Sequence, residues 1–145
     1  MADFTHDQAR RAIDGGLAFR RQCAARPIAI AVVDSGGHLV AAAREDEVGF
    51  LRTELAINKA WSCMAYGRST GAMQKRIAGH DHWMMAATGM VAGHRLIASP
   101  GGVVALDQYG RRVGAVGVAN ATNDEEIAIQ AIEAAGLVAD TDTPE

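Results

Sequence analysis

Residues 28–44 read Ile-Ala-Ile-Ala-Val-Val-Asp-Ser-Gly-Gly-His-Leu-Val-Ala-Ala-Ala-Arg, and this stretch decides the fold class. Its first six residues form a continuous apolar run, which is typical of a strand that is covered on both faces. Asp34–Gly37 has the composition of a tight turn. We therefore expect Ile28–Val33 and His38–Arg44 to pair as a β-hairpin, which predicts an antiparallel sheet.

The rest of the chain supplies a second hairpin and several helices. Residues 103–106 and 112–118 are apolar and flank a turn at Asp107–Gly110. A capping box over Thr5–Gln8 predicts a helix from about Asp7 to Arg26. Further helices are expected after Glu47, over 70–77, near 80–90 and from Asn123. A short strand is possible at 95–98, and the tail from Ala139 to Glu145 is expected to fray. This order predicts one α+β domain spanning residues 1–145, with helices packed on the sheet.

Two pairs of glycines mark places where another helix or strand is expected to pack closely against the backbone. Gly114 and Gly117 fall inside an expected strand, where a glycine is costly unless a neighbour leaves no room for a side chain. Gly15 and Gly16 fall inside the first expected helix, where each costs about 1 kcal/mol relative to alanine. We expect another element to pack directly against each pair.

Composition excludes several classes of protein. The formal net charge is −3 and only 5% of residues are aromatic, so a nucleic-acid partner is not expected. No apolar stretch reaches the roughly 20 residues of a membrane span, and no basic and apolar leader opens the chain. Cys23 and Cys63 are predicted to be buried thiols in a reducing compartment. These observations predict a cytoplasmic protein that does not enter a membrane.

Taken in order, the motifs resemble the GlcG/HbpS family, also called the haem-degrading domain family, over about residues 9–135. The motifs are Val32–Val40, Arg44–Asp46, Ala56–Ala60, Thr70, Pro100–Val103, Gly110, Gly114–Val118, Asp124 and Ile127–Ala128. The resemblance implies a profilin-like layout, a five-stranded antiparallel sheet flanked by helices, assembly into homo-oligomers and, for certain members, haem binding. The chain departs from the family pattern at Val104, where proline is common, and at Ala119–Ala121, where Ser-Gly-Gly is common.

A segment rich in histidine and methionine is the sharpest chemical feature. His80 and His82 are candidate metal or haem-iron ligands, and Trp83, Met84 and His94 are candidate ligand contacts. Neutral imidazoles can bind iron, and the methionines and the tryptophan would supply an apolar wall. The alternative is a polar helix start whose methionines fill the core.

Charged and amide side chains give a second group of candidates. Arg44 could grip a carboxylate, Glu45 could move protons, and Lys59 and His82 could act as acid or base groups. Each charged group could equally form a structural ion pair, with Asp34, Glu45 or Asp46 as partners for Lys59. Asn120 stands where the family glycines are missing and is a candidate ligand contact.

Smaller structural roles are expected at two further positions. Asp34 is expected to cap its own turn, and Thr70 is expected to cap a helix.

Three functions remain open. The first is a small-molecule binding protein of the GlcG/HbpS type, with haem as the named ligand and cofactor. The second is a cofactor-free enzyme that isomerises, hydrates or opens a small polar or carboxylated catabolite. The third is a non-catalytic subunit whose role is oligomeric assembly.

Overall fold

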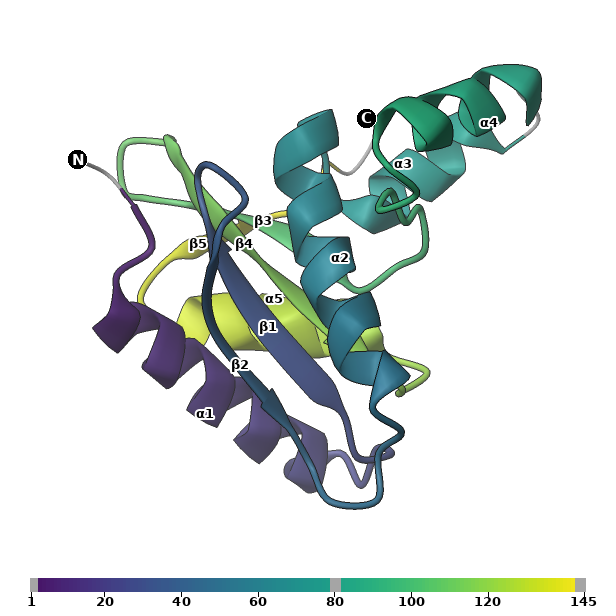
Figure 1. Ribbon diagram of the computed structural model, residues 1–145. Coiled ribbons are helices and arrows are strands. Elements are labelled where there is room, and N and C mark those ends of the chain that lie inside the picture. Colours follow the sequence, from purple (N-terminus) through teal and green to yellow (C-terminus); the bar gives the residue numbers. More distant parts are fainter. Residues whose placement is uncertain (1–2, 79–81, 143–145) are drawn as a thin grey trace.

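The computed structural model describes residues 3–78 and 82–142, and for residues 82–85 it describes the helical backbone only. Within these ranges the elements follow in the order α1 (His6–Gln22), β1 (Ala29–Asp34), β2 (Leu39–Arg44), α2 (Leu51–Tyr66), α3 (Thr70–Ile77), α4 (His82–Val91), β3 (Gly102–Leu106), β4 (Arg112–Ala119), α5 (Asp124–Ala134) and β5 (Val138–Asp140). Figure 1 shows their arrangement. The order is the predicted one, except that the possible strand at residues 95–98 is absent and one short strand is added at the end.

The strands form one sheet in the order β2-β1-β4-β3-β5, and every neighbouring pair is antiparallel. β1 and β4 lie side by side in the interior of the sheet, paired from Ala29 with Ala119 to Asp34 with Gly114. This interior position explains why both strands are apolar along almost their whole length. The predicted α+β class with a five-stranded antiparallel sheet is confirmed.

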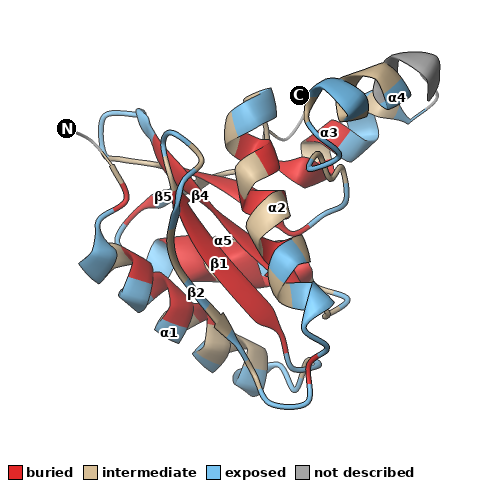
Figure 2. Ribbon diagram, viewed as in Figure 1, coloured by how far each residue is buried: buried red, intermediate tan, exposed pale blue. Residues whose placement is uncertain are grey.

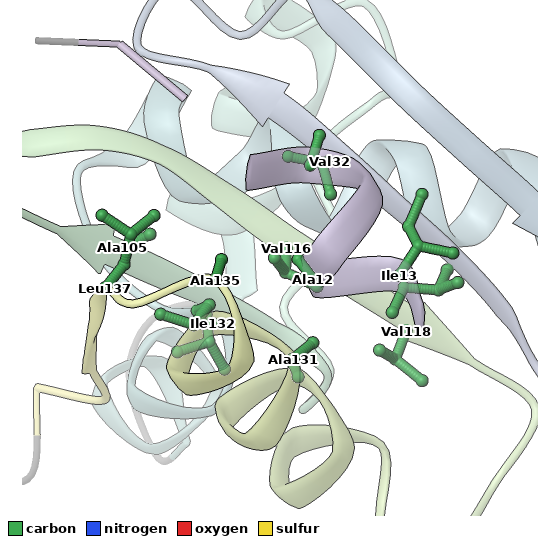
Figure 3. Close-up of a cluster of buried hydrophobic side chains, with 14 of the residues drawn as sticks. Ala12, Ile13, Val32, Ala105, Val116, Val118, Ala131, Ile132, Ala135 and Leu137 are labelled. Carbon is green, nitrogen blue, oxygen red and sulfur yellow. The ribbon is translucent and has the colours of Figure 1, made fainter. Parts of the chain in front are cut away.

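Helices cover both faces of the sheet. α1 and α5 pack together against one face, and α2 crosses the other (Figure 1). On the first face, Ile13 of α1, Ile132 of α5 and Val116 and Val118 of β4 belong to the main hydrophobic core (Figure 3). On the second face, mostly small side chains pack between the sheet and α2, among them Ala60 of α2 and Ala115 of β4. The burial map in Figure 2 shows this core as a continuous buried band through the sheet.

The close approaches expected at glycines are present. A Cβ built on Gly117 would lie 2.0 Å from the carbonyl oxygen of Ala56, so α2 rests directly on the β4 backbone. A Cβ on Gly15 would lie 2.2 Å from the Cβ of Ala134, where α1 meets α5. Small residues thus allow α2 to pack closely on β4 and α1 to pack closely on α5.

Two local predictions about caps are confirmed. Thr5 and Gln8 form the reciprocal hydrogen bonds of a capping box at the start of α1. Asp34 accepts hydrogen bonds from the backbone N–H groups of Gly36 and His38, each at 3.0 Å, and so closes the β1–β2 turn. Both caps satisfy backbone donors that the helix or turn would otherwise leave free.

Three predicted boundaries are wrong. α1 ends at Gln22 rather than Arg26, because the chain turns at Ala24, which has a φ of 53°. Residues 95–98 form no strand, since Ser62 of α2 bonds this segment instead. Ala139 and Asp140, expected to fray, belong to β5 on the edge beside β3, and residues 143–145 of the predicted tail lie outside the described residues.

Two predicted side-chain roles are also wrong. The Thr70 hydroxyl does not cap α3 but accepts a hydrogen bond of 2.8 Å from the backbone N–H of Gly102, and so joins α3 to β3. Cys23 is exposed, because α1 ends before it. Cys63 is buried as predicted, and burial raises the pKa of its thiol to about 12, so it is inert at neutral pH.

α3 and α4 extend away from the sheet beyond the end of α2 (Figure 1). α4 is rich in apolar residues but spans only His82–Val91. Among the described helices, none combines the length and the apolar character needed to cross a lipid bilayer.

Candidate functional site

The predicted iron-binding segment lies in and around α4. His80 falls outside the described residues, and the side chains of His82, Trp83 and Met84 are likewise outside what the structure describes. Their backbone begins α4. His94 follows the helix in a turn, where it has a φ of 60° and is exposed to solvent. His94 is therefore the histidine of this segment whose side chain the structure places.

The turn after α4 is fastened to α2. The guanidinium carbon of Arg95 lies 4.0 Å from the ring centroid of Trp61, a cation–π contact. The Ser62 hydroxyl accepts a hydrogen bond of 2.9 Å from the backbone N–H of Ile97 and donates one of 2.6 Å to the carbonyl of Asn58. The chain therefore leaves α4 through an anchored segment, which holds His94 beside the end of that helix.

The end of α4 presents apolar side chains to solvent. Met90 is 70% exposed and Val91 is 90% exposed. Single exposed apolar residues are ordinary on proteins, but here two of them adjoin an exposed imidazole on a projecting helix. An accessible imidazole can ligate a metal ion, and the apolar side chains beside it can contact an apolar ligand.

Glu45 lies at the opposite end of α2 from this turn, and it ties α1 to the sheet. Its carboxylate accepts hydrogen bonds from the Nε of Arg20 at 2.9 Å, from a terminal nitrogen of the same guanidinium, and from the backbone N–H of Ile28 at 2.7 Å. Both side chains are mostly buried. Arg44 ends β2 and is exposed. The pairing proposed as the structural alternative for this charged group is thus present.

Lys59 is a buried cation, only 6% exposed, on the side of α2 that faces the sheet. Its ammonium group donates to the carbonyl of Val118 at 2.9 Å and to the carboxylate of Asp124 at 3.2 Å. Asp34, Glu45 and Asp46, the partners expected from the sequence, are not its partners. Lys59 meets Val118 and Asp124 instead, because the end of β4 and the start of α5 pass beneath the middle of α2.

Burial shapes the chemistry of Asp124. Desolvation is the largest influence and raises the pKa of its carboxyl, while the charge of Lys59 and the backbone N–H of Ala121 oppose that shift. In the sequence Asp124 is one of the motif residues that carry the family resemblance, and no ion pair is predicted for it. Its pairing with a lysine 65 positions away has no local signal.

Asn120 lies in the same neighbourhood. It has a left-handed φ of 97°, and its side-chain amide donates to the carbonyl of Pro27 at 2.7 Å. Lys59, Asn120 and Glu45 therefore gather at one end of the sheet, where β4 ends and β1 begins. Each of them is engaged by its own protein partner, so this group of contacts holds the end of the sheet together.

A protein-family model for "Haem degrading protein HbpS-like" matches residues 4–133. The chain belongs to this family. The prediction made from the ordered motifs is confirmed, and with it the assignment to a protein of the GlcG/HbpS type. No curated protein sequence matched the chain.

Several solved structures share the fold. The Klebsiella pneumoniae protein ORFY is 22% identical, with a TM-score of 0.80, and the match covers 91% of this chain and 90% of ORFY. PduOC, solved as a haem complex, is 20% identical, with a TM-score of 0.76 and coverage of 88% and 91%. A double mutant of Streptomyces reticuli HbpS is 23% identical, with a TM-score of 0.76 and coverage of 92% and 87%. At these identities the likeness establishes the architecture.

Proposed function

We propose that this HbpS-like chain is a haem-binding protein. The observation that carries the proposal is the match of the HbpS-like haem-degrading family model to residues 4–133. The haem complex of PduOC adds that this architecture can hold the cofactor. We place the haem against α4 and the turn at His94, where the described part of the chain offers an accessible imidazole beside apolar side chains.

The residues at this place suit haem chemically. His94 offers an imidazole and Met90 a thioether, and either group would be able to hold haem iron. Val91 adds apolar surface for the porphyrin, and the exposed Arg95 guanidinium can pair with a propionate while its face stays on Trp61. When bound, haem would supply an iron centre that takes axial ligands and can change oxidation state. His80, His82, Trp83 and Met84 remain predicted contacts in the same segment.

Titration with haemin tests this proposal. We expect the wild-type chain to shift and sharpen the Soret band, with saturation at a fixed ratio of haem to chain. His94→Ala and His82→Ala should weaken binding by roughly ten-fold or more, because each removes a candidate axial ligand.

The matched control is His6→Ala, which removes an exposed histidine at the start of α1. We expect this variant to titrate like the wild type. A spectrum that does not change with haemin, or that changes equally in all three variants, would contradict specific ligation in this segment.

We also propose that the chain forms a homo-oligomer through the projecting α3–α4 region. The exposed Met90 and Val91 support this, because a projecting helix can bury their apolar side chains, together with a haem bound beside them, against a neighbouring chain. Light scattering coupled to size exclusion should give a mass of several chains. Met90→Ser with Val91→Ser should lower that mass, while Phe50→Ser, which changes an exposed apolar residue at the start of α2, should not. A monomeric wild type would contradict the proposal.

We infer a cytoplasmic location, as the sequence predicts. The support is that both cysteines are free thiols, Cys23 being exposed and Cys63 buried. An exposed thiol remains reduced most readily in a reducing compartment.

A further inference from the structure

A surface hollow lies where the N-terminal stretch meets the β3–β4 turn and the connection from α5 to β5. It has a volume of about 330 Å³. Its floor is apolar, formed by the buried Val113 and Leu137, and its walls carry Asp3, Asp107, Tyr109 and Arg111. The volume falls at the small end of the range for small-molecule pockets. None of these residues belongs to the proposed haem segment.

The walls of the hollow are held in place before any ligand arrives. The N–H of Phe4 bonds the carbonyl of Val113 at 2.9 Å, which fixes the N-terminal stretch on β4. Asp107 accepts the backbone N–H groups of Tyr109 and Arg111 at 2.9 and 3.0 Å, and the Nε of Arg111 at 2.8 Å. A preformed site loses less conformational entropy on binding.

The charges around the hollow favour a cation. Hydrogen bonds from Ser35 hold the pKa of Asp3 below its usual value, and those from the β3–β4 turn do the same for Asp107. Both carboxylates are therefore ionised at neutral pH, against the single guanidinium of Arg111. Asp107 and Arg111 neutralise each other, so Asp3 has no cationic partner among the lining side chains; the positive charges that help to lower its pKa, His38 among them, lie outside the lining.

Tyr109 supplies an aromatic wall. Its side chain is 73% exposed, and the guanidinium carbon of Arg111 lies 5.1 Å from the ring centroid. An aromatic ring next to a carboxylate and over an apolar floor suits a ligand that has an ammonium head and a short hydrocarbon body.

We propose that this hollow, which we call the Tyr109 hollow, binds a small primary alkylamine, with the ammonium group on Asp3 and the hydrocarbon part over Val113 and Leu137. The proposal depends neither on haem nor on oligomerisation. An amine is preferred to a carboxylic acid because the one cation of the lining, Arg111, is already bound by Asp107.

The test is a titration of isotope-labelled protein at neutral pH and constant ionic strength, followed by amide chemical shifts. The probes are n-butylamine, its neutral counterpart 1-butanol and its anionic counterpart butyrate. We expect n-butylamine to give saturable shifts at Tyr109, Arg111 and Leu137, weaker shifts with 1-butanol, and none with butyrate. Asp3→Asn should weaken n-butylamine binding about five-fold, the effect of one partly exposed ion pair.

The matched control is Asp14→Asn, which removes the same charge from an exposed position on α1 outside the hollow. It should leave n-butylamine binding unchanged. Equal binding of n-butylamine and 1-butanol, tighter binding of butyrate, or equal effects of the two variants would each overturn the proposal. The haemin titration is independent of these outcomes.

Discussion

Replacing Lys59 by methionine will lower the free energy of unfolding by about 3–5 kcal/mol, the usual cost of removing one partner from a buried ion pair. Methionine matches the length of the lysine stem, so packing against the sheet is retained while the charge is lost. The carboxylate of Asp124 and the carbonyl of Val118 then lose a donor that lies within 3.2 Å of both. Urea denaturation at neutral pH measures the loss.

The pH dependence of the stability of Lys59→Met shows whether the lost ion pair with Asp124 causes the loss of stability. The pKa of Asp124 is raised in the folded wild type by burial, so the folded state holds a proton more readily than the unfolded state does. The stability that this carboxyl contributes is therefore present below its unfolded pKa, near 3.8, and is lost as the pH rises through the folded value. Without Lys59 the folded pKa rises further, so the deficit of the variant should be smallest in acid and grow toward neutral pH.

A double variant separates the charge from the packing. Lys59→Met combined with Asp124→Asn removes both charges, and it should be more stable at neutral pH than Lys59→Met alone, with little of its pH dependence. A deficit that is equal at every pH, or that the second substitution does not reduce, would show that the ion pair is not what Lys59 contributes.

The second large effect is expected at Gly117. A Cβ at this position would lie 2.0 Å from the Ala56 carbonyl oxygen and 2.8 Å from the backbone nitrogen of Ala60. Both contacts are with the backbone of α2, so the helix must lift from the sheet. We expect Gly117→Ala to lower the free energy of unfolding by about 3 kcal/mol or more.

Gly49→Ala is the matched control, since a Cβ there meets no atom within 4 Å. Its stability should stay close to that of the wild type or rise slightly, because alanine restricts the unfolded chain. Thermal unfolding followed by circular dichroism compares the two. If Gly117→Ala is as stable as Gly49→Ala, then α2 does not rest on β4 as described.

Local patterns predicted much of this fold. The hairpin at residues 28–44, the capping box at Thr5 and the paired glycines all express short-range rules of backbone geometry, and the structure confirms them. The family followed from the order of such motifs along the chain. Features that depend on residues close together in the sequence could therefore be predicted.

Long-range partners were not predictable in the same way. Lys59 meets Asp124 and Thr70 meets Gly102 only after the sheet has brought distant segments together, and neither pair has a characteristic spacing. Arg20 and Glu45 could be recognised as charged, but not as partners across α1 and the sheet. The exposure of Cys23 depends on the residue at which α1 ends. The ends of helices are among the features that a sequence predicts least reliably.

The most direct test of the haem proposal is a crystal structure of the chain grown with haemin. We expect a porphyrin lying against α4 and the turn after it, with its iron held by a histidine of residues 80–94. Haem bound at the end of the sheet, beside Lys59 and Asn120, would contradict the placement. Crystals grown in excess haemin that contain no bound porphyrin would contradict the proposed function itself.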